Sequence, residues 1–319
     1  MRISILDAYA TDQGDAAMWE PIRALGETAI YPRTAPSELL ARCGEADVVL
    51  TNKVPLDDAA MRALPALRYI GVTATGTNIV ALDAARAHRI AVSNVPGYST
   101  ASVAQHVIAL LLHLTNDVGA LSQRTKAGAW AASPDYCFFR KPLIELDGKV
   151  LVIIGMGMIG AATARIATSL GMRVIAAQVP GSASPGRMPL TQALAQADAV
   201  TLHCPMTPQT TGLVDDRFLG ALKPGAILIN TGRGGLVDET AVLRALQSGR
   251  LGGLAIDVLG KEPAIPSHPL LAADASWADR VVVTPHVAWG TIESRRRLVA
   301  DAAANLAAFM RGERRNRVE

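Results

Sequence analysis

The chain has 319 residues, of which 50% are hydrophobic, 18% are charged and 4% are aromatic, and its formal net charge is +3. This length fits two domains with sizeable cores, and the composition is that of a folded rather than a disordered chain. The small basic excess lacks the aromatic-rich basic stripe of a nucleic-acid-binding surface, so we expect no nucleic-acid partner.

The cysteines and the apolar stretches argue against further classes of protein, namely disulfide-rich, zinc-binding, secreted and membrane-spanning proteins. Cys43, Cys137 and Cys204 lie far apart, are odd in number and form no CxxC pair. That usage argues against a disulfide framework and against a zinc site, so we expect no metal. The first residues are strand-like rather than signal-like, and the longest uncharged apolar stretch, 107–114, is too short for a bilayer span. We expect a cytoplasmic protein with no membrane partner.

Residues 1–97 alternate short apolar runs with helical spacing. Strands are predicted at 3–6, 48–50, 69–72 and 90–92, and helices at 36–43, 57–63 and 81–88. This alternation predicts a βαβ series, hence a parallel sheet with helices on both faces. An apolar helical pattern follows over 102–126. It is longer than a typical globular helix, and helices of this length between domains often pack against a second subunit.

A second βα series begins at residue 148. Strands are predicted at 148–154, 174–177, 199–202, 226–229, 253–256 and 281–283. The last segment, 291–312, is a strongly periodic helix that we expect to return to the first domain. The sequence therefore predicts two α/β domains with doubly wound parallel sheets.

Residues 150–160 read VLVIIGMGMIG, so a buried strand leads directly into Gly155, Gly157 and Gly160, and helix-forming sequence follows. In that context a GxGxxG pattern indicates a dinucleotide site, because the glycines permit a tight turn and close approach to a pyrophosphate. The helix N-terminus then offers the backbone N–H groups of Met158 and Ile159 to the phosphates. The alternative is a merely tight strand–helix turn.

The next strand bears on which dinucleotide is accepted. It ends at Gln178, where an acid usually holds the ribose 2′-hydroxyl. No carboxylate there repels a 2′-phosphate, and Ser182, Ser184 and Arg187 lie within loop reach of one. We predict NAD(P) as the cofactor, with NADP(H) tolerated. The alternative is that the neutral Gln178 hydrogen-bonds an ordinary NAD ribose.

Three later strands each precede a side chain capable of chemistry, namely Arg233, Glu262 and His286. They are expected to meet, because open α/β sheets bind ligands at the carboxyl ends of their strands. An imidazole, with a pKa near neutrality, suits proton donation to a 2-keto acid during hydride transfer. Glu262 would fix its tautomer and raise the pKa of His286, and the forked Arg233 matches a carboxylate and its keto oxygen. Each residue alone also has a structural interpretation, as a helix cap, a surface turn or a structural histidine.

These residues lie in motifs with a family resemblance. NTGRGGLVDE (230–239), DVLGKEP (257–263) and TPHVAW (284–289) resemble the signatures of the D-isomer-specific 2-hydroxyacid dehydrogenases. Four further stretches resemble the glycerate dehydrogenase/hydroxypyruvate reductase branch of this family. They are TNKVPL (51–56), VTATGTN (72–78), NVPGYSTASVAQHV (94–107) and LHCPMTPQTTGLV (202–214). The resemblance covers nearly the whole chain.

The resemblance implies a homodimer that reduces hydroxypyruvate or glyoxylate to the D-2-hydroxy acid. It implies Rossmann-like or flavodoxin-like domains with a cleft between them, a substrate domain of 1–97 plus 290–319, and a dinucleotide-binding domain of 98–289. Matched by motif, Arg233 orients the substrate, His286 is the proton donor and Glu262 is its partner. The implied substrate-binding residues are Lys53, Thr75, Gly76, Arg233 and Trp289, although Trp289 could equally be interface packing. The implied cofactor-binding residues are Gly155, Gly157, Met158, Ile159, Gly160, Gln178, His203, Cys204, Pro205, Thr231, Gly232, Asp257 and Ala288.

Two positions depart from the family pattern. Gln178 replaces the usual acid, and Ala81 stands where Asp is common, an expected loss of a helix cap worth about 1 kcal/mol. Other functions remain open. An NAD(H)-sensing, corepressor-like binding protein would keep the cofactor loop, and another 2-keto acid such as pyruvate would suit the same trio. Formate or phosphite oxidation fits less well, because the formate enzymes pair Gln with the catalytic His, whereas Glu262 stands here.

Overall fold

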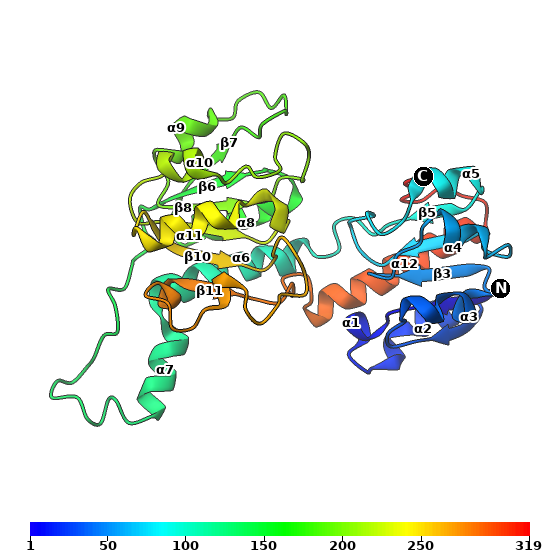
Figure 1. The fold of residues 1–319 in the computed structure, drawn as a ribbon, viewed down its shortest axis with the longest axis horizontal. Coiled ribbons are helices and arrows are strands. Elements are labelled where there is room, and N and C mark those ends of the chain that lie inside the picture. Colours follow the sequence, from blue (N-terminus) through cyan, green and yellow to red (C-terminus); the bar gives the residue numbers. More distant parts are fainter. The chain divides into compact units, whose positions relative to one another are not determined.

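Figure 1 shows the computed structural model, which describes residues 1–319. The chain forms two compact units: unit 1 combines Met1–Ser99 with Trp289–Glu319, and unit 2 is Thr100–Ala288. The chain thus leaves unit 1 once and returns to it once. None of the helices combines the length and the apolar character that crossing a membrane requires.

Unit 1 is built on a five-stranded parallel sheet with the order β2-β1-β3-β4-β5. Its strands are β1 (Arg2–Ile5), β2 (Glu27–Ile30), β3 (Val48–Thr51), β4 (Tyr69–Val72) and β5 (Ala91–Ser93). The predicted strands are confirmed, because β3 and β4 are wholly buried and therefore read as apolar runs. The sequence did not predict β2, an edge strand whose residues are exposed or half-buried in alternation.

Helices cover both faces of this sheet. One face carries α3 (Leu39–Cys43), α4 (Asp58–Arg62) and α5 (Leu82–Ala87), and the other carries α2 (Glu20–Arg23) and α12 (Ile292–Met310), while α1 (Tyr9–Asp12) follows β1. The long C-terminal helix α12 is confirmed and begins where the side chain of Thr291 accepts a hydrogen bond from the Ser294 N–H. Its residues Leu298 and Leu306 are fully buried in the unit 1 core.

Unit 2 is built on a six-stranded parallel sheet with the order β11-β10-β9-β8-β6-β7. Its strands are β6 (Val150–Ile154), β7 (Arg173–Ala177), β8 (Ala199–Leu202), β9 (Ala226–Asn230), β10 (Leu251–Ile256) and β11 (Val281–Val283). Helices α9 (Leu190–Leu194), α10 (Asp216–Ala221) and α11 (Glu239–Gln247) pack over one face, and α6 (Thr100–Asn116) and α8 (Met158–Ser169) belong to the other. The predicted fold class, two doubly wound α/β domains, is confirmed.

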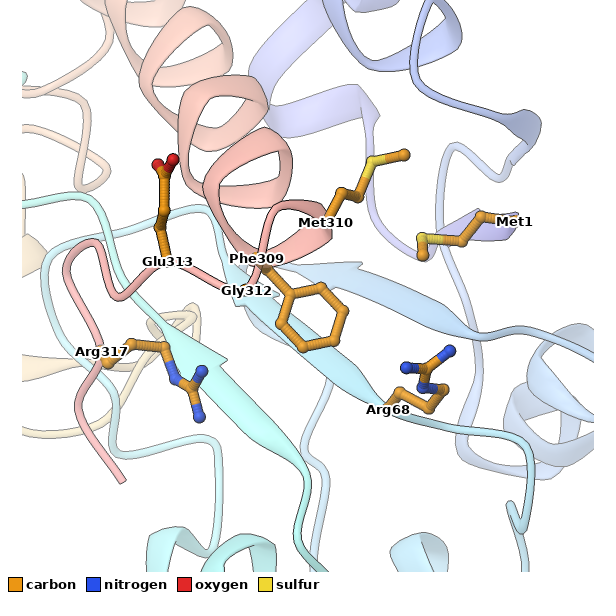
Figure 2. Close-up of a pocket in the computed structure, with 7 residues that line it drawn as sticks. All are labelled: Met1, Arg68, Phe309, Met310, Gly312, Glu313 and Arg317. Carbon is orange, nitrogen blue, oxygen red and sulfur yellow. The ribbon is translucent and has the colours of Figure 1, made fainter.

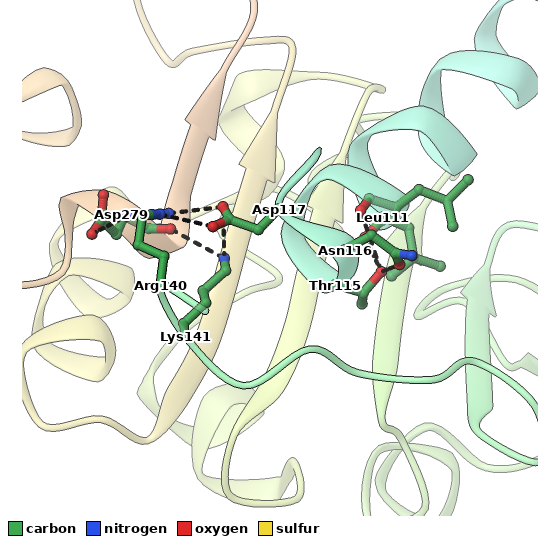
Figure 3. Close-up of polar contacts among 8 residues, drawn as sticks. Leu111, Thr115, Asn116, Asp117, Arg140, Lys141 and Asp279 are labelled. Carbon is green, nitrogen blue, oxygen red and sulfur yellow. Dashed lines mark hydrogen bonds and ion pairs between the residues drawn. The ribbon is translucent and has the colours of Figure 1, made fainter. Parts of the chain in front are cut away.

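The predicted helix over 102–126 is wrong as a single element. The structure has α6, then α7 (Val118–Lys126), with Asp117 between them in the left-handed conformation at φ 53°. Figure 3 shows why: the buried Asp117 carboxylate accepts hydrogen bonds from Arg140 Nε at 2.7 Å and Nη2 at 2.8 Å. The Arg140 guanidinium also holds the pKa of Asp117 below its usual range. Apolar spacing could not reveal a break set by a partner so far along the chain.

Candidate active site

Three neighbouring strands of unit 2 lead to the predicted chemical trio. β9, β10 and β11 lie side by side and run parallel, with Ile256 of β10 aligned with Asn230 and Val283. Arg233, Glu262 and His286 follow these strands, so all three come from loops at one edge of the sheet. This is the edge at which open α/β sheets bind ligands.

The structure brings Glu262 and His286 into direct contact. Nδ1 of His286 lies 2.6 Å from Oε2 of Glu262, and the second carboxylate oxygen accepts a hydrogen bond from the Leu259 N–H at 2.9 Å. An ionised carboxylate can only accept, so Nδ1 carries the shared proton. Both side chains are about one-third exposed, at 31% and 34%. The pair is thus fixed in orientation while it stays accessible to a reactant.

The Arg233 loop lies against the loop that holds Glu262. A Cβ on Gly234 would stand 1.9 Å from the carbonyl oxygen of Leu259, so only glycine allows this approach of the two backbones. The Asn230 side chain closes the turn, because it donates to the Arg233 carbonyl at 2.8 Å and accepts from the Gly232 N–H at 3.0 Å. Arg233 itself is exposed, and its Nη1 donates to the Gly232 carbonyl.

Asp257 and Ala288, two residues expected to line the cofactor, are hydrogen-bonded to each other. Asp257 is 2% exposed, and its carboxylate accepts hydrogen bonds from the hydroxyl of Thr284 and from the backbone N–H groups of Val287 and Ala288. In the sequence, these three donor residues lie on either side of His286. The carboxylate therefore holds the loop that presents the imidazole, a contact that motif matching did not reveal.

The glycine-rich loop sits where the strand order of the sheet reverses, between β6 and β8. Gly155 has φ 103°, and a Cβ there would stand 2.4 Å from the backbone nitrogen of Cys204. A Cβ on Gly160 would stand 2.2 Å from the Gly155 carbonyl, whereas one on Gly157 would meet open space. Helix α8 begins at Met158, so its first N–H groups, including that of Ile159, face this loop.

The residues around this loop fit a dinucleotide. Thr231 has a buried hydroxyl oxygen without a protein partner, as expected of a group that faces a bound ligand. Burial lowers the pKa of His203 to about 4 and raises the pKa of the Cys204 thiol. At neutral pH both are uncharged, so the segment that ends at Pro205 presents a neutral wall to the cofactor loop.

The segment after β7 folds back on its own strand. The Gln178 N–H donates to the Met188 carbonyl at 2.8 Å, and the Met188 N–H donates to the Ala176 carbonyl at 3.1 Å. This return brings Arg187 beside the strand end, while Ser182 and Ser184 hydrogen-bond each other at 3.0 Å in the loop between. Gln178 is exposed.

Comparison with known proteins identifies the family in which these features occur. Residues 108–288 match the model of the D-isomer specific 2-hydroxyacid dehydrogenase, NAD binding domain. A hydroxypyruvate reductase from Blautia hydrogenotrophica is 40% identical over 320 residues, which cover 98% of each chain. A glycerate dehydrogenase from Methylorubrum extorquens is 38% identical over 284 residues, which cover 89% of each chain. The chain belongs to this family.

Among solved structures, the TT0316 protein from Thermus thermophilus superposes with a TM-score of 0.85, at 33% identity and with both chains fully covered. As a D-isomer specific 2-hydroxyacid dehydrogenase, the protein is an NAD-dependent oxidoreductase that acts on 2-hydroxy acids. The predicted family, enzyme class and NAD cofactor are confirmed, and the corepressor-like alternative gives way to an enzyme.

The family's expected substrate-binding residues in unit 1 lie at the carboxyl ends of its strands. Lys53 follows β3, and Thr75 and Gly76 follow β4, the strand next to it. Thr75 is exposed, and its hydroxyl donates to the Val95 carbonyl at 3.1 Å. Trp289 packs edge-on against Tyr98 at a ring-centroid distance of 6.3 Å, so it has a packing role within unit 1.

Figure 2 shows a surface pocket of about 350 Å³ elsewhere in unit 1. Its lining residues include Met1 and Arg68, which precede β1 and β4, together with Phe309 from the end of α12. It therefore lies at the amino-terminal edge of the sheet, opposite the edge that carries Lys53 and Thr75. A dehydrogenase with this fold would not bind its substrate there.

Proposed function

We propose that this dehydrogenase reduces hydroxypyruvate or glyoxylate to the corresponding D-2-hydroxy acid, with unit 2 as the dinucleotide-binding domain and unit 1 as the substrate domain. The observation that carries the proposal is the 2.6 Å contact between Glu262 and His286, placed beside the Arg233 loop. The relatives named hydroxypyruvate reductase and glycerate dehydrogenase support the choice of substrate.

Reduction adds a hydride to the keto carbon and a proton to its oxygen. A nicotinamide cofactor, when bound, would supply the hydride. His286 would donate the proton from Nε2 of its doubly protonated ring, because its Nδ1–H stays hydrogen-bonded to the Glu262 carboxylate. Arg233 would bind the substrate carboxylate and the keto oxygen with its forked N–H groups.

The remaining contacts divide between the two ligands. For the substrate, we assign the backbone N–H groups of Thr75 and Gly76 to the carboxylate, and Lys53 and Trp289 to the pocket wall. For the cofactor, Gly155, Gly157 and Gly160 with the N-terminus of α8 would hold the pyrophosphate. The other cofactor contacts we assign are Met158, Ile159, Gln178, His203, Cys204, Pro205, Thr231, Gly232, Asp257 and Ala288.

Steady-state kinetics with hydroxypyruvate, glyoxylate and pyruvate test this function. We expect His286→Ala to lower kcat at least about 100-fold, because proton donation contributes that much. Arg233→Lys should also lower kcat/KM strongly, since an ammonium cannot form the two-pronged contact. A His286→Ala enzyme with wild-type turnover would remove His286 from its role, and faster reduction of pyruvate would reassign the substrate.

We further propose that the enzyme uses NADPH as well as NADH. The support is the neutral Gln178 at the end of β7 and the return of the following loop, which brings Arg187 beside it. Arg187→Ala should lower kcat/KM for NADPH about tenfold and leave NADH unchanged, because only NADPH carries a 2′-phosphate. Arg173→Ala, at the opposite end of β7, is the matched control. A wild-type enzyme that accepts NADH alone would refute this assignment.

The oligomer we propose is a homodimer that buries the arm formed by α7 and the segment 127–144. Helix α7 has no buried residue, and the segment exposes Trp130, Tyr136 and Phe139, at 55%, 89% and 69%. Exposed apolar surface of this extent is typical of a protein interface. Light scattering should give twice the 33.5 kDa chain mass, and Phe139→Glu should shift it toward the monomer. Leu40→Glu, at an exposed position of unit 1, should leave the dimer intact.

A further inference from the structure

His286 has an unusual backbone. Its φ is +54°, the left-handed region that L-residues with a Cβ rarely occupy. That conformation persists only where the surrounding structure fixes it. Here Asp257 does so: its carbonyl accepts the His286 N–H at 2.8 Å, and its carboxylate accepts the next two N–H groups at 2.9 Å each. Asp257 therefore binds three consecutive N–H groups, from His286 to Ala288, and these bonds fix the direction of the imidazole.

Helix α6, which packs on one face of the sheet, forms hydrogen bonds with the same loop. The Ser102 hydroxyl donates to the Ala288 carbonyl at 2.6 Å, and Nε2 of His106 lies 3.0 Å from the Thr284 hydroxyl. Ser102 and His106 are four residues apart, so they lie on one face of the helix. The Thr284 contact lies at the start of the loop and the Ala288 contact at its end, so the two contacts flank His286.

The direction of the hydrogen bonds follows from their chemistry. The Thr284 hydroxyl lies 2.6 Å from Oδ1 of Asp257 and must donate its single proton to that carboxylate. The hydroxyl can then only accept from His106, whose Nε2 therefore carries a proton. The same nitrogen lies 3.6 Å from Oδ1 of Asp257. The result is a directed chain from His106 through Thr284 to the carboxylate that holds the His286 loop.

We propose that His106 is a positioning residue for His286, acting through Thr284 and Asp257. The inference rests on the proposed role of His286 as proton donor. His106 acts without touching a reacting atom: its N–H keeps the Thr284 hydroxyl turned toward Asp257, and the carboxylate in turn keeps His286 in its left-handed conformation. Loss of the His106 N–H would make the position of the His286 imidazole less well defined without removing any contact to the substrate.

The test compares variants at position 106. His106→Leu removes the N–H at similar size, whereas His106→Gln returns an amide N–H to the same reach. We expect His106→Leu to lower kcat about tenfold, less than the roughly 100-fold cost of a full 1 Å misplacement, because the other bonds to the His286 loop remain. KM and the Kd for NADH should stay within twofold of wild type. His106→Gln should recover most of that loss. His113→Leu, at an exposed position of the same helix, is the control.

A second readout needs no turnover. Amide hydrogen exchange at Val287 and Ala288 should rise in His106→Leu and return toward wild type in His106→Gln. If exchange and kcat are unchanged in His106→Leu, or if His106→Gln is no better than His106→Leu, the proposal is wrong. If His286→Ala keeps full activity, the proposed function has failed instead, while the exchange experiment still tests the hydrogen-bonded chain by itself.

Discussion

A methyl group added at Gly234 should separate the two loops that carry Arg233 and Glu262. The Cβ would stand 1.9 Å from the oxygen and 2.0 Å from the carbon of the Leu259 carbonyl, both of them backbone atoms that no side-chain rotation can move away. Restoring even a 3.0 Å contact requires a shift of about 1.1 Å. Displacements of that size at a reacting group cost about 100-fold in rate, and overpacking costs about 1–3 kcal/mol of stability.

We therefore expect Gly234→Ala to fold, to unfold at lower urea concentration, and to lose about 100-fold in kcat/KM with hydroxypyruvate. The loss of reduced cofactor, followed by absorbance, gives the rate. Gly220→Ala is the matched control: it lies within α10, nothing is within 4 Å of its Cβ, and alanine favours a helix by up to about 1 kcal/mol. A folded Gly234→Ala enzyme with wild-type kcat/KM would refute the reasoning.

Two further predictions concern stability. Burial lowers the pKa of His203 from 6.5 to about 4, so the unfolded chain takes up the proton first as the pH falls. This group alone should cost wild type up to about 3 kcal/mol between pH 6.5 and pH 4. In urea unfolding, His203→Gln should lose less stability over that range by about the same amount, and parallel pH profiles would contradict this. Ala81 is the N-cap of α5 and makes no side-chain capping bond. Ala81→Asp should therefore raise the free energy of unfolding by about 0.5–1 kcal/mol, and an unchanged urea midpoint would show that the turn cannot present the carboxylate.

The sequence was most informative where burial is complete. β6, β8 and β9 are buried at every residue, so their apolar runs indicated both the strands and the residues that follow them. The glycine loop was recognisable because a Cβ at Gly155 or Gly160 would stand less than 2.5 Å from backbone atoms, which excludes every other residue type. The family motifs then added the roles that spacing alone left open.

What the sequence did not reveal depends on contacts between distant residues. The helix break at Asp117 is set by Arg140, and the bracing of the His286 loop joins Ser102 and His106 to residues more than 170 positions away. Asp257 appeared only as a cofactor ligand, since no local pattern tells a carboxylate that binds backbone N–H groups from one that faces a ligand. The edge strand β2 is half-exposed and has no apolar run to detect.

The hydrogen bond between Ser102 and Ala288 also bears on how unit 2 can be handled as a protein in its own right. These residues stand near the two ends of Thr100–Ala288, so the inserted segment starts and finishes at adjacent points. Adjacent ends mean that excising the segment exposes little backbone and that a short linker could join them with a small entropic cost of closure. Circular permutation with new termini in an exposed loop, such as 181–186, is consequently open to this domain.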